Sequence, residues 1–154
     1  MSLTRLERFD HWMLHTVSRV GPELMRVALC VVYVWFGGLK VLGLSPAESM
    51  VGELLMHTMP VIPFPIFLML FGVFEMVVGL LFLFPRLTRL AILLLVLHMF
   101  TTFLPLMLLP EITWQQWFVT TLVGQYILKN VVILALALAV GLDLEPLKRS
   151  ISTR

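Results

Sequence analysis

Three ionisable residues, Glu75, His98 and Lys129, lie deep inside long apolar stretches of this chain. Counted from residues 64, 87 and 118, each lies 11 residues in, or about 16 Å along a helix, so all three fall at a similar depth of a bilayer. A charge at the bilayer centre costs roughly 2.5 to 3.5 kcal/mol on insertion scales, so such residues usually have partners and often a task. A buried acid, imidazole and amine can relay protons or hydrogen-bond a ligand.

Neighbouring residues indicate which way these side chains point. Glu75 follows Gly72 by three residues and precedes Gly79 by four, and small residues at this spacing mark a helix face where backbones approach closely. His98 shares its face with Thr102. On the last apolar stretch, a polar stripe at helical spacing comprises Gln125, Lys129 and Asn130. These spacings predict an inward-facing polar centre.

Lys40 lies at a different level from this centre. Fourteen residues separate it from Arg26, about 21 Å of helix, which places Lys40 in the outer third of the first apolar stretch. Two orientations remain open. The long side chain snorkels to the outer headgroups, or it turns inward, three residues after Gly37.

Two interpretations of the polar centre also remain open. In the structural one, Glu75 pairs with Lys129, and Gln125 and Asn130 hydrogen-bond across helices. Such contacts in membranes contribute only about 0.6 kcal/mol on average and need no further purpose. In the functional one, the polar pocket binds a ligand or passes protons. His98 fits either a core position with satisfied hydrogen bonds or a ligand contact.

The elements that must position these residues are four membrane-spanning helices. The chain of 154 residues is 60% hydrophobic and 13% charged, whereas soluble domains are typically about 25% charged. Four apolar stretches, each near the roughly 20 residues that a bilayer requires, cover residues 24–44, 64–84, 87–109 and 118–142. Because short connections make neighbouring helices antiparallel, we expect an all-α integral membrane four-helix bundle.

Basic residues predict the orientation of these helices. They precede or open the first stretch, occupy the second turn and end the chain, at Arg5, Arg8, Arg19, Arg26, Arg86, Arg89, Lys148, Arg149 and Arg154. The first and third connections carry only acidic charges. By the positive-inside rule both termini are cytoplasmic. The net charge of +2 reflects this topology, and the expected partner is the lipid bilayer and not nucleic acid.

Three regions follow from this organisation. Residues 1–21 form an expected amphipathic helix along the cytoplasmic interface, because apolar residues recur at helical spacing opposite much of its charge. Gly21 and Pro22 then turn the chain into the first span. Residues 22–143 form the four-helix domain and residues 144–154 a basic cytoplasmic tail. In the outer connections, Ser45 is expected to cap a short helix, and Trp114 and Trp117 to anchor at the interface.

Several chemistries have little support. Cys30 is the single cysteine, and one thiol cannot form the internal disulfide that dithiol oxidoreductases use. His11 and His15 stand four residues apart, but no carboxylate or thiolate completes a metal site. Neither a Gly-rich phosphate loop nor a serine nucleophile motif is present. We therefore expect no metal and no covalently bound cofactor.

Three segments together resemble the DoxX-like superfamily of small four-helix membrane proteins, including its reactive-chlorine resistance relatives. They are residues 35–40 (WFGGLK), 72–80 (GVFEMVVGL) and 126–130 (YILKN). The resemblance covers roughly residues 24–142. It implies a four-helix bundle in the bacterial cytoplasmic membrane and singles out Glu75, Lys129 and Lys40. Members include a small subunit of a thiosulfate:quinone oxidoreductase and proteins tied to oxidative stress.

The leading hypothesis is a small membrane subunit of a redox or oxidative-stress system that binds a quinone between its helices. Lys129, His98 or Asn130 donates to a quinone carbonyl and Glu75 relays protons. Lacking a redox centre of its own, the chain needs an electron-donating partner, so at most it is a quinone-binding subunit of an oxidoreductase. The alternatives are a non-enzymatic scaffold or assembly helper with a structural ion pair, and a small transporter or proton pathway.

Overall fold

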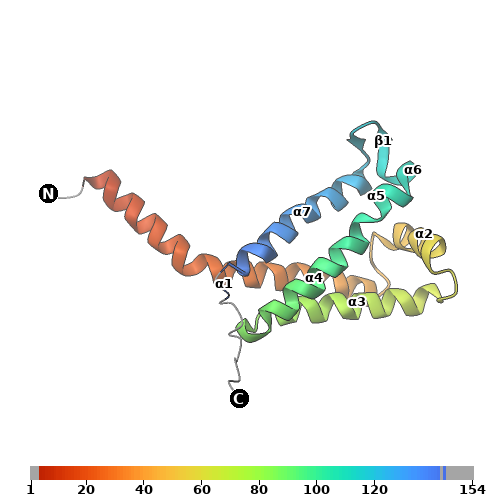
Figure 1. The fold of residues 1–154 in the computed structure, drawn as a ribbon, viewed down its shortest axis with the longest axis horizontal. Helices are drawn as coiled ribbons and strands as arrows, with labels where there is room; N and C mark the ends of the chain where they lie inside the picture. The colour runs from red at the N-terminus through yellow and green to blue at the C-terminus, as the bar shows by residue number, and fades with distance from the viewer. Residues whose placement is uncertain (1–3, 143, 145–154) are drawn as a thin grey trace, which may run out of the picture.

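The structure is a computed structural model that describes residues 4–142 and 144. It is mostly helical, as Figure 1 shows. The elements in chain order are α1 (Arg5–Val41), α2 (Glu48–Thr58), α3 (Phe64–Leu81), η1 (Pro85–Leu87), α4 (Thr88–Phe103), α5 (Pro105–Leu108), α6 (Pro110–Thr113), β1 (Trp114–Gln116), β2 (Val119–Thr120) and α7 (Leu122–Val140).

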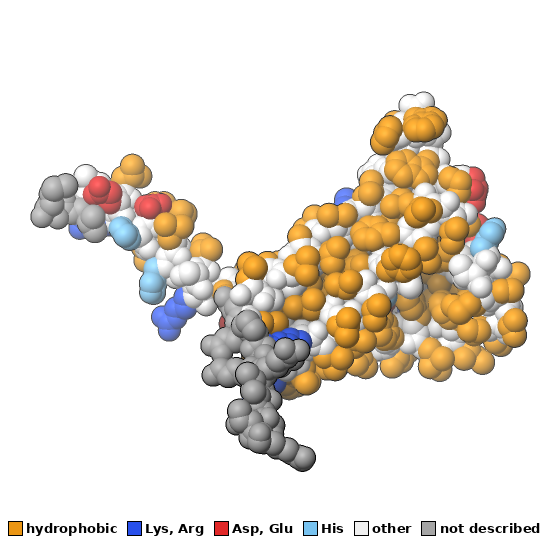
Figure 2. Space-filling model, viewed as in Figure 1, with side chains coloured by type: hydrophobic (Ala, Val, Ile, Leu, Met, Phe, Trp, Pro, Cys, Tyr) orange, Lys and Arg blue, Asp and Glu red, His pale blue; other side chains and the backbone are white. Residues whose placement is uncertain are grey.

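Four of these helical segments are long and apolar enough to cross a membrane. They are α1, α3, the run Pro85–Leu108 and α7. Hydrophobic side chains cover most of the visible surface around them (Figure 2), as expected where the solvent is lipid. The prediction of four spanning helices in a multi-pass membrane protein is confirmed. A two-stranded antiparallel hairpin, β1–β2, is the departure from an all-helical chain among the described residues.

α1 continues through the position where the sequence predicted a turn. Its first residues are held by a capping box, in which Thr4 accepts from the Glu7 backbone and Glu7 accepts from the Thr4 backbone. Pro22 lies inside the helix, which bends in its middle and carries its N-terminal part away from the other helices (Figure 1). The predicted start of a new helix at Pro22 is wrong, and the chain changes direction through a bend within one helix, because an internal proline can kink a helix without ending it.

The connection between α1 and α3 forms the predicted short helix, but not through the predicted cap. α2 begins after Ala47, which makes no side-chain capping bond, and the Ser45 hydroxyl accepts from the Ala47 amide instead. Val51 and Leu55 are buried. α2 therefore packs against α3 and α5 and covers one end of the helices.

The three aromatic residues of the β1–β2 hairpin differ in exposure. The Trp114 indole is half-buried and donates to the Leu106 carbonyl at 2.9 Å, so it fastens the hairpin to α5. Trp117 and Phe118 are exposed at the tip, and Phe118 has a left-handed φ of 58°. Trp117 thus stays free to act as the predicted interfacial anchor, while Trp114 makes an internal contact.

Candidate functional site

Glycines let α1 and α3 approach closely enough to place a buried polar cluster between them. A Cβ added at Gly37 would lie 2.5 Å from the Gly72 carbonyl oxygen, and one added at Gly72 would lie 2.5 Å from that of Gly37. A Cβ at Gly79 would lie 2.7 Å from the Cβ of Tyr33. Close approaches of this kind between helices are what small residues permit in membranes. They bring the faces that carry Lys40 and Glu75 together.

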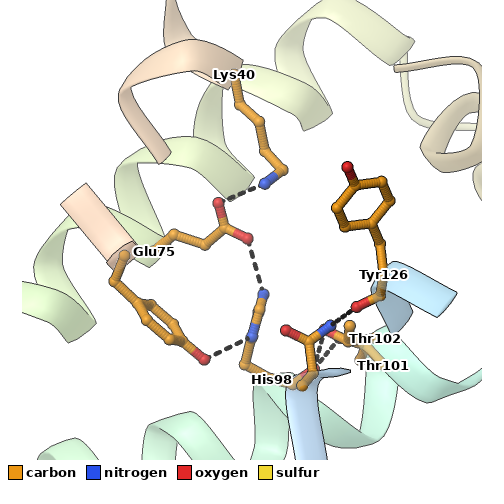
Figure 3. A network of polar contacts seen from close by, with 8 residues as sticks. Lys40, Glu75, His98, Thr101, Thr102 and Tyr126 are labelled. Carbon is orange, nitrogen blue, oxygen red and sulfur yellow. Dashed lines mark hydrogen bonds and ion pairs between the residues drawn. The ribbon is translucent and has the colours of Figure 1, made fainter. Parts of the chain in front are cut away.

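Lys40 of α1 and Glu75 of α3 form a buried ion pair. The Lys40 Nζ lies 2.6 Å from the Glu75 Oε2, and the two side chains are only 9% and 7% exposed. Figure 3 shows both pointing into the space between the helices. An ammonium and a carboxylate that leave water together keep their charges only when geometry and further hydrogen bonds are good. Glu75 has such a further bond.

His98 of α4 extends the pair to a third helix and to Tyr33. Its Nε2 lies 3.0 Å from the Glu75 Oε1, and its Nδ1 lies 3.1 Å from the Tyr33 hydroxyl. The neutral tautomer that satisfies both contacts donates from Nε2 to the carboxylate and accepts from Tyr33 at Nδ1. We call the resulting set Tyr33, His98, Glu75 and Lys40 the polar chain.

Aromatic rings and two threonines fix the position of His98. The rings of Phe71 and Phe74 lie 5.2 and 5.9 Å from the imidazole, centroid to centroid. The Thr101 and Thr102 hydroxyls donate to the His98 carbonyl at 2.7 and 3.0 Å (Figure 3). The imidazole is therefore packed on an apolar wall, where low polarity strengthens its hydrogen bonds.

The polar chain can hold and exchange protons. All four members carry an ionisable hydrogen-bonding group, and consecutive members lie within hydrogen-bond distance. Lys40 ends the chain with three N–H donors, of which one points at Glu75. The other two remain for a carbonyl or anionic oxygen. With Lys40 charged, Glu75 ionised and His98 neutral, the cluster carries no net charge.

The structure brings together three of the six residues that the sequence singled out. Lys40, Glu75 and His98 meet, so Lys40 turns inward and does not snorkel outward. The three residues of the α7 stripe lie elsewhere. Gln125 and Lys129 are exposed, and Asn130 is half-buried and donates to the Tyr126 carbonyl within its own helix.

The predicted pairing of Glu75 with Lys129 is wrong. Glu75 pairs with Lys40 and His98, while the Lys129 Nζ lies 4.9 Å from the centre of the Tyr126 ring. α7 buries Gly124 and Ile127. Lys129 follows Ile127 by two residues, about 200° around the helix, so the face that Ile127 buries leaves Lys129 on the outside.

Tyr33 was missed by the sequence analysis, although its spacing carries a signal. It precedes Gly37 by four residues and Lys40 by seven, so all three share one face of α1. A tyrosine on the same face as a glycine contact and an intramembrane lysine belongs to the same site. Cys30, on the same helix, is a half-buried free cysteine.

In the described part of the chain, no three histidine, cysteine or acidic residues lie close enough together to hold a metal ion. No family model, curated protein or solved structure matches this chain.

Proposed function

We propose that this chain is a DoxX-like four-helix bundle of the bacterial inner membrane, with both termini cytoplasmic. We propose further that it is a small membrane subunit of a redox or oxidative-stress system and binds a quinone-like ligand beside Lys40. An electron-donating protein partner supplies the reducing equivalents. The observation that carries this proposal is the buried polar chain, because intramembrane ionisable residues are costly and usually functional.

The family assignment is supported by the meeting of two of its three segments. Residues 35–40 and 72–80 touch through Gly37 and Gly72, and this contact joins their charged residues Lys40 and Glu75. The third segment, residues 126–130, does not contribute to the polar chain, since its lysine, Lys129, is exposed and lies over Tyr126. The site therefore draws on the first two segments and adds His98 and Tyr33.

The expected interfacial position of residues 4–20 belongs to the same proposal. All of them are exposed, and the first half-buried residues of α1 are Gly21 and Pro22. Their main apolar face comprises Leu6, Phe9, Met13, Val17 and Val20, and the opposite face comprises Arg8, His11, His15, Ser18 and Arg19. A helix with these two faces lies in the headgroup region of a membrane, and the bend in α1 permits that position.

The residues present fit a quinone carbonyl. Lys40 retains two N–H donors beyond its bond to Glu75, and the Phe71 ring lies 5.4 Å from its Nζ, which offers an aromatic surface beside the amine. A bound quinone supplies a membrane-soluble acceptor of two electrons and two protons. Lys40 orients the carbonyl oxygen and donates a proton to it.

When Lys40 gives up that proton, the negative charge of Glu75 is stabilised by His98, which Tyr33 holds in place. The Glu75 carboxylate is then left without its counter-charge, and the hydrogen bond from His98 stabilises it. The uncompensated carboxylate favours return of a proton to Lys40. Two such cycles supply the two protons, and Tyr33 holds His98 in the required tautomer throughout.

A scaffold function has one observation in its favour. The bonds of the polar chain join α1, α3 and α4 to one another, which is what a structural clamp requires. The clamp alone predicts that Glu75→Gln lowers the stability of the protein and its recovery with partners. It predicts no change in affinity for any quinone.

Titration with a short-chain ubiquinone analogue distinguishes these functions. We expect purified protein in mild detergent to bind it saturably, and Lys40→Met to weaken binding by about tenfold or more, since a charged hydrogen bond contributes about 1.5–3 kcal/mol. Lys129→Met is the matched control, because this lysine is exposed on α7. Absence of saturable binding, or equal effects of the two substitutions, would overturn the quinone assignment.

A further inference from the structure

The residues that line α4 change from polar to apolar toward one end of the molecule. His98 is followed, one turn at a time toward the start of α4, by Leu95, Ala91 and Thr88. Leu95 and Ala91 are both completely buried. The same order holds on α1, where Tyr33 is followed by Leu29 and then Arg26. Both helices therefore place an apolar layer below the polar chain.

This apolar layer is closed in the structure. Its buried members come from α1, from α3 and the residue that follows it, and from α4, and none is more than 1% exposed: Leu29, Val78, Phe82, Ala91 and Leu95. They belong to one hydrophobic cluster that Ala137 and Val140 of α7 complete. A cavity holds water only where it is roomy and offers polar partners, and these aliphatic and aromatic side chains offer none.

Below the layer the side chains become polar again. The Nη1 of Arg26 donates both to the Phe82 carbonyl, at 3.2 Å, and to the Thr88 hydroxyl, at 2.6 Å. Arg26 precedes Tyr33 by seven residues, about 10 Å of helix. The polar chain and this arginine contact are thus separated by two helical turns of dry packing.

At the opposite end, the polar chain lies close to the end of a helix. Lys40 is the last residue but one of α1. The turn that follows contains Gly43, with a left-handed φ of 65°, and leads to α2. The Lys40 side chain retains 9% exposure, whereas the layer below the chain retains almost none. The short route to water therefore runs past Lys40.

We infer that the polar chain exchanges protons only through the end of the molecule that carries α2, and that the apolar layer seals it from the Arg26 end. In the proposed topology the α2 end faces outward. The inference rests on the proposed function only in treating the polar chain as a proton carrier. It names the side from which Lys40 regains each proton, and it argues against a proton pathway across the membrane.

Proton entry into liposomes tests the seal without any quinone or partner. The full chain is reconstituted in phosphatidylethanolamine and phosphatidylglycerol vesicles that contain a pH-sensitive dye, with the membrane potential clamped by valinomycin and potassium. After an external pH step, vesicles with the native protein should acidify as slowly as protein-free vesicles. Faster entry through the native protein would overturn the inference.

Opening the layer should convert the polar chain into a conductor. Leu29→Ser together with Leu95→Ser makes room for water and adds hydroxyls between His98 and Arg26, and we expect proton entry about tenfold faster or more. Adding Glu75→Gln should abolish the increase. The matched control, Leu24→Ser with Leu93→Ser, changes leucines on the same helices that are 63% and 56% exposed, and it should leave the native rate unchanged.

Two results with the opened variant would contradict the inference. One is a folded, monodisperse variant that does not conduct, and the other is conduction that persists after Glu75→Gln. If the variant does not fold, Ala91→Cys in a Cys30→Ser background provides a single thiol inside the layer. A water-soluble maleimide should leave this thiol unmodified until the protein is denatured, and labelling of the native protein would show that water reaches the layer. Failure of quinone binding alters neither readout.

Discussion

Lys40→Met should lower the free energy of unfolding by about 3–5 kcal/mol, because it leaves the buried Glu75 carboxylate without its counter-charge. The Glu75 side chain is 7% exposed and the Lys40 Nζ lies 2.6 Å from it. Water therefore cannot replace the lost partner. His98 still donates to the carboxylate, but a neutral donor compensates for only part of a full charge.

The size of the pair's contribution is measured by a double-mutant cycle. Glu75→Gln alone should also destabilise the protein, since it leaves the buried Lys40 ammonium without its counter-charge. The combination of Lys40→Met with Glu75→Gln should cost less than the sum of the single changes, because replacing both charges removes the unpaired one. The glutamine carbonyl can still accept from His98.

Unfolding of the purified protein in mixed micelles, followed by circular dichroism, provides the measurement. Lys129→Met is the control, and we expect a change of no more than about 0.5 kcal/mol, because Lys129 is exposed and lies over its neighbour Tyr126. Additive single effects at Lys40 and Glu75 would mean that the two charges do not interact. Equal effects at Lys40 and Lys129 would contradict the placement of Lys40 inside the protein.

The sequence predicted the depth of the site in the membrane better than it predicted which residues contact one another there. Hydropathy fixed four spans, and counting along them placed Glu75 and His98 at one level, where they do meet. Depth is one coordinate only. The direction in which a side chain leaves its helix decides its contacts, and in α7 the stripe with Lys129 points away from the buried face of Ile127.

Glycine spacing carried the directional information that charge alone lacks. Glu75 lies between Gly72 and Gly79 and points inward, and Lys40 lies after Gly37 and also points inward. No glycine precedes Lys129 at three or four residues, and this lysine points outward. The continuity of α1 through Pro22 was not predicted, for a different reason. A proline makes a helix locally less stable, but the sequence does not show whether the helix ends there or continues with a bend.

Gly72→Ala should separate α1 from α3 and break the polar chain at its centre. The added Cβ would lie 2.5 Å from the Gly37 carbonyl oxygen and 2.9 Å from the Cβ of Lys40. Backbone atoms cannot rotate away as a flexible side chain can, so the helices must move apart. Overpacking of this kind costs about 1–3 kcal/mol or more. In lipid, where close packing holds helices together, the lost contact has no hydrophobic replacement.

Gly38→Ala is a closely matched control for Gly72→Ala, because it makes the same chemical change in α1, next to Gly37. A Cβ at Gly38 meets nothing within 4 Å, so alanine should add up to about 1 kcal/mol of helix stability there. The two substitutions should therefore shift the unfolding midpoint in micelles in opposite directions. Equal shifts would mean that α1 and α3 do not approach as closely as their glycines permit.

The same pair of variants separates helix contact from ion pairing. If Gly72→Ala acts by moving Lys40 away from Glu75, then Lys40→Met should cost less in the Gly72→Ala protein than in the native one, because part of the pairing has already been lost. Gly38→Ala should leave the cost of Lys40→Met unchanged. An undiminished cost in both backgrounds would show that the pair tolerates separation of the helices, and the glycine contact would then serve packing and not the polar chain.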